Sequence, residues 1–165
     1  MTNKHTASVA VALVVLALPN TFRAAEPLED FSQSVAVLSA PGQPTLHRKQ
    51  LLAMFYRCAV ELKVQDRLMP RVVVVSAGAE EADVADVSRK GHIFIEHHPQ
   101  SGNIVYMAWI VGRPRDSDII EVFVKVLNNA FAIGLSPEQV DAMVKRLYAE
   151  HSATIEVNSM LEEHR

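Results

Sequence analysis

Hydrophobic positions along the chain follow two different periods, which predict a mixture of helices and strands. Apolar residues recur at three- and four-residue spacing between about Thr45 and Val64, a pattern that predicts a helix with one buried face. Arg71–Ser76 contains four consecutive valines and is apolar on both faces, which predicts a strand in the interior of a sheet. Ser34–Ser39 predicts a shorter strand within an otherwise proline-rich stretch.

Two further apolar segments predict an antiparallel hairpin. Gly91–His98 and Asn103–Val111 bracket a turn, residues 99–102, that contains proline and glycine. The second segment is apolar at both alternating sets of positions, so we expect it inside the sheet as well. Residues 79–90 are acidic and lack apolar periodicity, which predicts an exposed loop.

The C-terminal third predicts two helices. Asp116 or Ser117 can cap a helix to about Ile133, whose apolar residues cover more than half of its circumference, so we expect it between the sheet and another layer. Residues 136–139, Ser-Pro-Glu-Gln, have the form of a capping box with proline at the first helical position. Residues 153–157 alternate in polarity and predict a last edge strand.

The N-terminus has the layout of a secretory signal peptide. Lys4 supplies a positive charge, Val9–Leu18 is an unbroken apolar run, and Pro19 ends it. Such a run is too short for a membrane-spanning helix, which needs about 20 residues. We expect cleavage near Ala25 and an exported protein, periplasmic or extracellular, with no stable membrane span; the alternative is a cytosolic protein with an N-terminal helix.

These elements predict an α+β fold: a small mixed sheet of three to four strands, made of the central valine-rich strand and the antiparallel hairpin, packed against about three helices. The predicted division of the chain is a signal peptide at 1–25, a linker at 26–45, a single domain at 46–158 and a charged tail at 159–165.

Charge and cysteine content narrow the range of partners. The full chain has a formal net charge of −3, and removal of Lys4 and Arg23 leaves 14 basic against 19 acidic residues, a net charge of −5. Because the basic residues are also scattered, we do not expect nucleic acid as a partner. Cys58 is the single cysteine, so no intramolecular disulfide can form. Its place in an apolar helical stripe indicates a small buried residue, and the alternative is a reactive thiol.

A cluster of histidines and a carboxylate on the first hairpin strand suggests a metal site. His92 and Glu96 would lie about 13 Å apart on an extended strand, too far to share an ion bonded at about 2 Å. Glu96 and His98 could converge, alone or with a distant residue such as His151, and they are our candidate zinc ligands. The alternative is that His97 and His98 are simply solvated at a strand end.

The order of elements loosely resembles the core of the zincin metallopeptidases, in which a hairpin edge precedes a helix bearing His-Glu-x-x-His. The corresponding helix here, 118–131, contains no histidine. The resemblance therefore implies a shared architecture at most, without the metal site of those enzymes.

No motif in the sequence points to a specific reaction, because hydrolase elbows and phosphate-binding loops are missing. We expect core roles for Tyr106 and Trp109. Of Asn128 and Asn129, we expect one to bind a nearby loop and the other to face solvent; the alternative is that they line a cleft. We therefore hypothesise an exported, non-catalytic module that binds an unknown protein or small molecule, with no catalytic residues and no cofactor. A purely structural role and a metal-dependent hydrolase using Glu96 and His98 are the alternatives.

Overall fold

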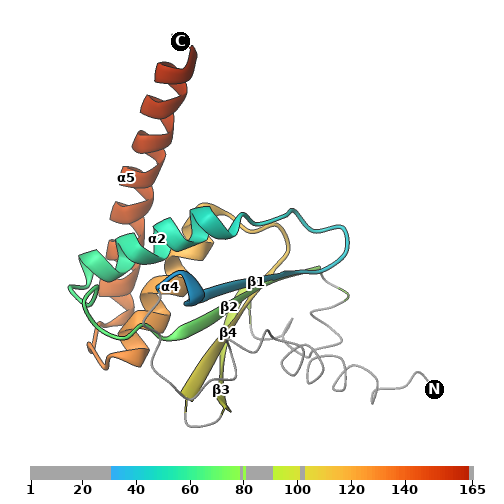
Figure 1. Cartoon of the computed structure of the whole chain (residues 1–165), viewed down its shortest axis with the longest axis vertical. Coiled ribbons are helices and arrows are strands. Elements are labelled where there is room, and N and C mark those ends of the chain that lie inside the picture. Colours follow the sequence, from blue (N-terminus) through green and yellow to red (C-terminus); the bar gives the residue numbers. More distant parts are fainter. Residues whose placement is uncertain (1–30, 79, 81–90, 101–102, 164–165) are drawn as a thin grey trace.

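The computed structural model describes residues 31–78, 80, 91–100 and 103–163. In this part of the chain one mixed sheet of four strands packs against three α-helices (Figure 1), which confirms the predicted α+β fold. The loop expected at 79–90, apart from Glu80, and the signal peptide expected at 1–25 lie outside the described residues. The elements are η2 (Phe31–Gln33), β1 (Val35–Ser39), α2 (Arg48–Glu61), β2 (Arg71–Ala77), β3 (Ile93–Gln100), β4 (Asn103–Val111), α4 (Asp116–Ala130) and α5 (Pro137–Glu163).

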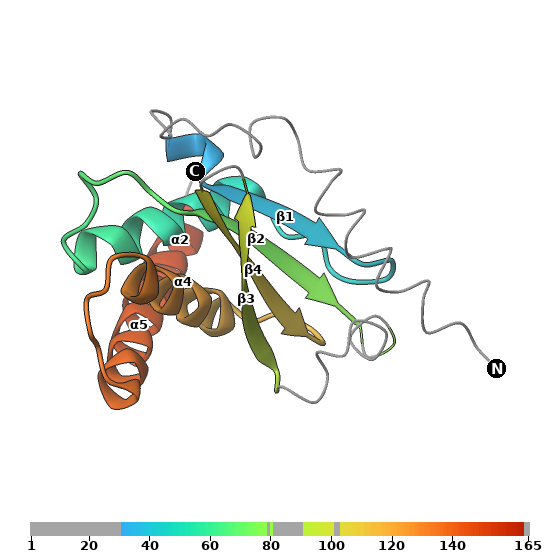
Figure 2. The same cartoon turned by 90° about the horizontal axis from the view of Figure 1, so that it is seen from below.

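The strands lie in the order β1-β2-β4-β3 (Figure 2). β2 pairs in parallel with β1 on one side and with β4 on the other, and β3 is antiparallel to β4 at the edge. All seven residues of β2 are buried, as expected for an interior parallel strand covered on both faces. The valine-rich strand and the hairpin are therefore confirmed, and the short strand predicted at Ser34–Ser39 is β1. This strand lies within the range 26–45 that was expected to be mainly linker.

One face of the sheet carries the three helices. α2 and α4 cross this face, and the rings of Phe55 and Phe123 meet with their centroids 5.0 Å apart. α4 is covered on its other side by α5, whose Val140, Val144 and Leu147 belong to the same core. Leu127 of α4 is 0% exposed. The predicted position of this helix between the sheet and another layer is confirmed.

The other face of the sheet is also apolar. A second cluster of buried side chains lies there, separate from the helical core and bordered by Leu38 and Phe94. Its members come from β2 and β4: Val73, Val75, Ala77, Val105, Met107 and Trp109. The core roles expected for Trp109 and, on the helical face, for Tyr106 are therefore confirmed.

The start of α2 differs from the prediction. The helix begins at Arg48 with His47 as its N-cap residue, and not at Thr45. His47 makes no side-chain capping bond. Instead the Arg48 guanidinium Nε donates a 2.9 Å hydrogen bond to the Val35 carbonyl, which ties the first turn of the helix to β1. A long-range contact therefore determines this boundary, which local capping preferences could not reveal.

α5 is longer than expected. The capping box at its start is confirmed: the Gln139 backbone N–H donates to Ser136 Oγ at 3.2 Å, and the Ser136 N–H donates to Gln139 Oε1 at 2.9 Å. The strand predicted at 153–157 is wrong, because these residues continue the helix, which runs to Glu163 through most of the expected tail. Once a helix is nucleated, each further residue adds a hydrogen bond, and this outweighs a brief alternation of polarity.

A buried carboxylate fixes the first turn of α4. Asp118 accepts hydrogen bonds from the Arg115 backbone N–H at 2.8 Å and from the Arg115 guanidinium at 2.9 Å. His92 directly precedes β3, and its Nε2 atom lies 3.0 Å from the same carboxylate. Burial alone would raise the pKa of Asp118, but the hydrogen bonds from Arg115 and His92 outweigh it, so the pKa is lowered.

We predict that this carboxylate makes folding sensitive to acid. Because its pKa is lower in the folded state, the stabilisation is complete above the unfolded value of about 3.9 and is lost as the pH falls through the folded value. Asp118→Asn should lower the free energy of unfolding at pH 7 by about 1–3 kcal/mol and flatten its decline in acid. Urea unfolding from pH 7 to pH 2.5 measures both effects. Asp141→Asn, at an exposed pair with Lys145, is the control, and an undiminished acid slope in Asp118→Asn would contradict the prediction.

Candidate functional site

The structure brings the two predicted metal ligands together. Glu96 and His98 lie on the same face of β3, and His98 Nε2 is 3.2 Å from Glu96 Oε2. The indole Nε1 of Trp109 on β4 donates to that same oxygen at 3.2 Å. The other histidines go elsewhere: His97 meets the ring of Tyr106, and His151 pairs with Asp116. The proposed convergence of His98 with His151 is not seen.

Two ligands do not make an ordinary zinc site. Structural and catalytic zinc ions in proteins take at least three protein ligands. In the ranges 31–78, 91–100 and 103–163 no three His, Cys, Asp or Glu side chains are close enough together to hold one ion. One oxygen of Glu96 is already bound by Trp109. The described residues around Glu96 and His98 therefore do not fit zinc, and we derive no reaction from them.

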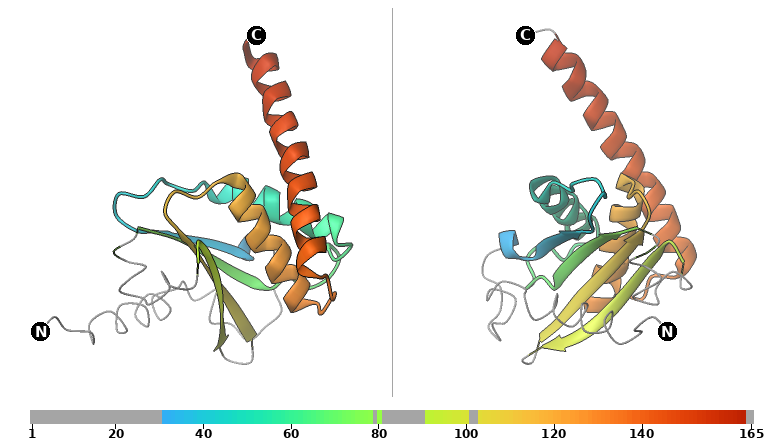
Figure 3. Two further views of the ribbon diagram at one scale, coloured as in Figure 1. Left: turned by 180° about the vertical axis from the view of Figure 1, so that it is seen from behind. Right: turned by 90° about the vertical axis from the view of Figure 1, so that its right-hand side faces the viewer.

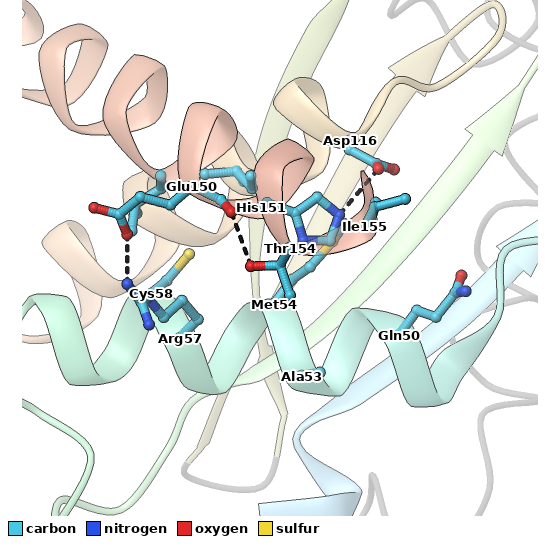
Figure 4. A pocket seen from close by; sticks show the side chains of 12 residues that line it. Gln50, Ala53, Met54, Arg57, Cys58, Asp116, Glu150, His151, Thr154 and Ile155 are labelled. Atoms are coloured by element: carbon cyan, nitrogen blue, oxygen red, sulfur yellow. Dashed lines mark hydrogen bonds and ion pairs between the residues drawn. The ribbon is translucent and has the colours of Figure 1, made fainter. Parts of the chain in front are cut away.

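A groove between α2 and α5 is the other candidate site (Figure 4). It has a volume of about 360 Å³, within the range of small-ligand pockets, and opens to solvent where the two helices diverge. α4 contributes to its lining at the first turn. Much of the lining is apolar: Ala53, Met54, Cys58, Ile120, Leu147 and Ile155.

The charged residues of the groove are paired with one another. Arg57 of α2 forms an ion pair with Glu150 of α5. His151 Nε2 lies 3.1 Å from the Asp116 carboxylate at the start of α4. Because each of these four polar side chains already has a partner within the groove, the groove is suited to an apolar group more than to an ion.

The single thiol lies in the wall of this groove and is chemically quiet. Cys58 is buried and free, and burial raises its pKa to about 12. The thiolate is the nucleophilic form, so the side chain stays protonated and unreactive near neutral pH. This confirms the prediction of a small buried residue and argues against a reactive thiol.

The two asparagines of α4 have structural partners. Asn128 accepts a 2.9 Å hydrogen bond from the Leu135 backbone N–H, and its own amide donates to the Leu135 carbonyl at 3.3 Å. Asn129 is exposed and accepts a 3.0 Å bond from the Tyr106 hydroxyl. Asn128 thus binds the loop after the helix, as predicted, and Asn129 faces solvent.

The C-terminal part of α5 projects beyond the rest of the domain. We call residues 152–163 the α5 extension; its first residues, Thr154 and Ile155 among them, still line the groove, and beyond them the helix rises clear of the sheet and of the other helices in three views (Figures 1 and 3). Ile155 and Met160 on it are 47% and 64% exposed. The extension has no lysine or arginine, whereas Glu156, Glu162 and Glu163 make it acidic.

Sequence reasoning missed this feature because it divided the segment between a strand and a tail. A signal was present, since no proline or glycine interrupts the chain after the capping box at 136–139. Its exposure could not have been read from the pattern, because Ile155 and Met160 are residue types that usually face a core.

The sequence matches no protein-family model, and no curated protein or solved structure is similar to it. None of the helices in the described ranges is both long and apolar enough to span a membrane.

The metal hypothesis is open to direct measurement. We expect protein purified without chelators to carry far less than one zinc ion per chain, because Glu96 and His98 supply only two ligands. Elemental analysis of the wild type and of His98→Ala, with exposed His47→Ala as the control, makes the comparison. One zinc ion per chain that is lost only in His98→Ala would contradict the expectation and restore the metal-dependent hydrolase.

Proposed function

We propose that the protein is an exported, non-catalytic module that binds another protein through the groove and the α5 extension. The observation that carries the proposal is the projection of a helix with exposed Ile155 and Met160 next to an apolar groove. A large exposed apolar side chain beside an apolar groove favours an interaction surface.

The chemistry of the groove supports binding more than catalysis. A nucleophile or a general base needs a side chain that is free to take or give a proton at the working pH. Cys58 is held protonated by burial, the Glu150 carboxylate is in an ion pair with Arg57, and the Asp116 carboxylate is in hydrogen-bond contact with His151. These groups therefore shape and orient the groove.

The stability of the extension supports a protein partner over a small molecule. Twelve residues span about 18 Å along a helix axis, and although they continue a nucleated helix, their described side chains beyond Ser152 are exposed and supply little of the packing that stabilises helices in proteins. Thr154, Ile155 and the acidic residues near the C-terminus weaken it further, since β-branched residues and negative charge at that end are unfavourable. A partner surface of similar length would bury the apolar side chains and hold the helix.

A metal-dependent hydrolase around Glu96 and His98 is the second candidate. This candidate is favoured only by the 3.2 Å approach of the two side chains. The elemental analysis of the wild type and of His98→Ala tests it.

Export is the part of the proposal that rests on the N-terminal pattern of Lys4, Val9–Leu18 and Pro19. We predict that a bacterium expressing the full chain delivers it to the periplasm with a mass that starts near residue 25 or 26. Cell fractionation followed by intact mass spectrometry tests this. A full-length species confined to the cytoplasm would overturn export and leave the binding proposal to be judged separately.

The binding surface can be tested by photo-crosslinking. A benzoylphenylalanine residue at position 155 or 160 should give discrete crosslinked products in the cells that naturally make the protein. The same residue at position 68 is the control, because Leu68 is equally exposed but lies in the connection before β2. Absence of products at 155 and 160, or the same products at 68, would refute this interaction surface.

A further inference from the structure

The extension and the groove-bearing helix carry opposite charges. Lys49, Ala53 and Arg57 follow one another at four-residue spacing, so they form one stripe along α2. Ala53 and Arg57 line the groove, and Lys49 and Arg57 are both exposed. The extension has only acidic charges, Glu156 and Glu162 among them. Arg57 already pairs with Glu150, so Lys49 is the residue of this stripe that offers a positive charge to the extension.

Within one chain, α5 contacts the groove beside α2 only up to the start of the extension. Arg57 reaches Glu150, and Ile155 is the last residue of α5 that lines the groove. Beyond it the helix rises away from α2 (Figures 1 and 3), and Glu156 and Met160 remain exposed. The complementary surfaces of a single chain thus cannot meet along their full length.

We propose that the partner is a second copy of this chain, which rests on the proposed binding function and deepens it. In this dimer the extension of each copy lies along α2 of the other, with Met160 against the apolar groove and Glu156 near Lys49. Each chain provides one extension and one groove, and each extension occupies the groove of the other copy. The two contacts are related by a two-fold axis, so the assembly ends at a dimer.

Charge decides how the two copies meet. If the extensions paired only with one another, their glutamates would face like charges, which costs free energy. Placed on the α2 stripe, each extension brings Glu156 near Lys49 instead, while Arg57 keeps its ion pair with Glu150. The arrangement buries Met160, which shares a helix face with Glu156 at four-residue spacing, and supplies a surface for this face of the extension.

Sedimentation equilibrium tests the dimer. The sample is the protein purified after expression of the full chain, at protein concentrations from below 1 to several hundred micromolar. The wild type should self-associate with a mass twice that of the chain. Met160→Glu and Lys49→Glu should each raise the dissociation constant roughly tenfold or more, because one removes the apolar anchor and the other places like charges together. Lys49→Glu combined with Glu156→Lys should restore association to within about threefold of the wild type.

Lys145→Glu is the matched control, since this exposed lysine pairs with Asp141 on α5 and lies outside the groove lining. The four substituted residues are all exposed: Lys49, Lys145, Glu156 and Met160. An unchanged circular dichroism spectrum of each variant shows that it keeps the fold. A protein that stays monomeric at every concentration overturns the dimer, as does a dimer that ignores Met160→Glu and Lys49→Glu. A photo-crosslinked product of another mass at position 155 would retain the binding function while excluding the second copy as its partner.

Discussion

The fold depends on burying α4 from two sides at once. Leu127, Phe123 and Val126 lie in the interior between the sheet and the other helices and are fully buried. A helix this apolar cannot face water, so it requires both the sheet beneath it and α5 above it. α2 closes a third side through the contact of Phe55 with Phe123. The same requirement holds for β2, all of whose residues are buried, and for residues 105–110 of β4, which are buried on both faces of the sheet.

The candidate site follows from a mismatch in helix lengths. α4 has 15 residues and α5 has 27, so the second half of α5 has no α4 beside it to pack on. At the point where the support ends, α5 diverges from α2 and the groove opens between them. Asp116 at the start of α4 pairs with His151 there and marks the end of the supported part. The groove and the extension thus both follow from the greater length of α5 compared with α4.

Much of the fold could be predicted from the sequence, because its strongest signals are local. The four valines of β2, the hairpin and the capping box at Ser136 each specify an element without reference to distant residues. The N-terminus of α2 could not be predicted, since it is set by the contact of Arg48 with β1, and no local rule contains that contact. The candidate site was least accessible. Glu96 and His98 do converge as strand geometry requires, but the groove needs α2 and α5, whose paired residues Arg57 and Glu150 lie 93 residues apart in sequence.

We propose that a partner, and not its own chain, holds the α5 extension in place. Hydrogen–deuterium exchange along α5, measured by mass spectrometry below and above the concentration at which the protein associates, tests it most directly. We expect amides of residues 152–163 to exchange rapidly when the protein is dilute and to become protected when it associates, while residues 140–150 stay protected throughout. Equal protection along the whole of α5 at every concentration would contradict it, because the extension would then be stable without a partner.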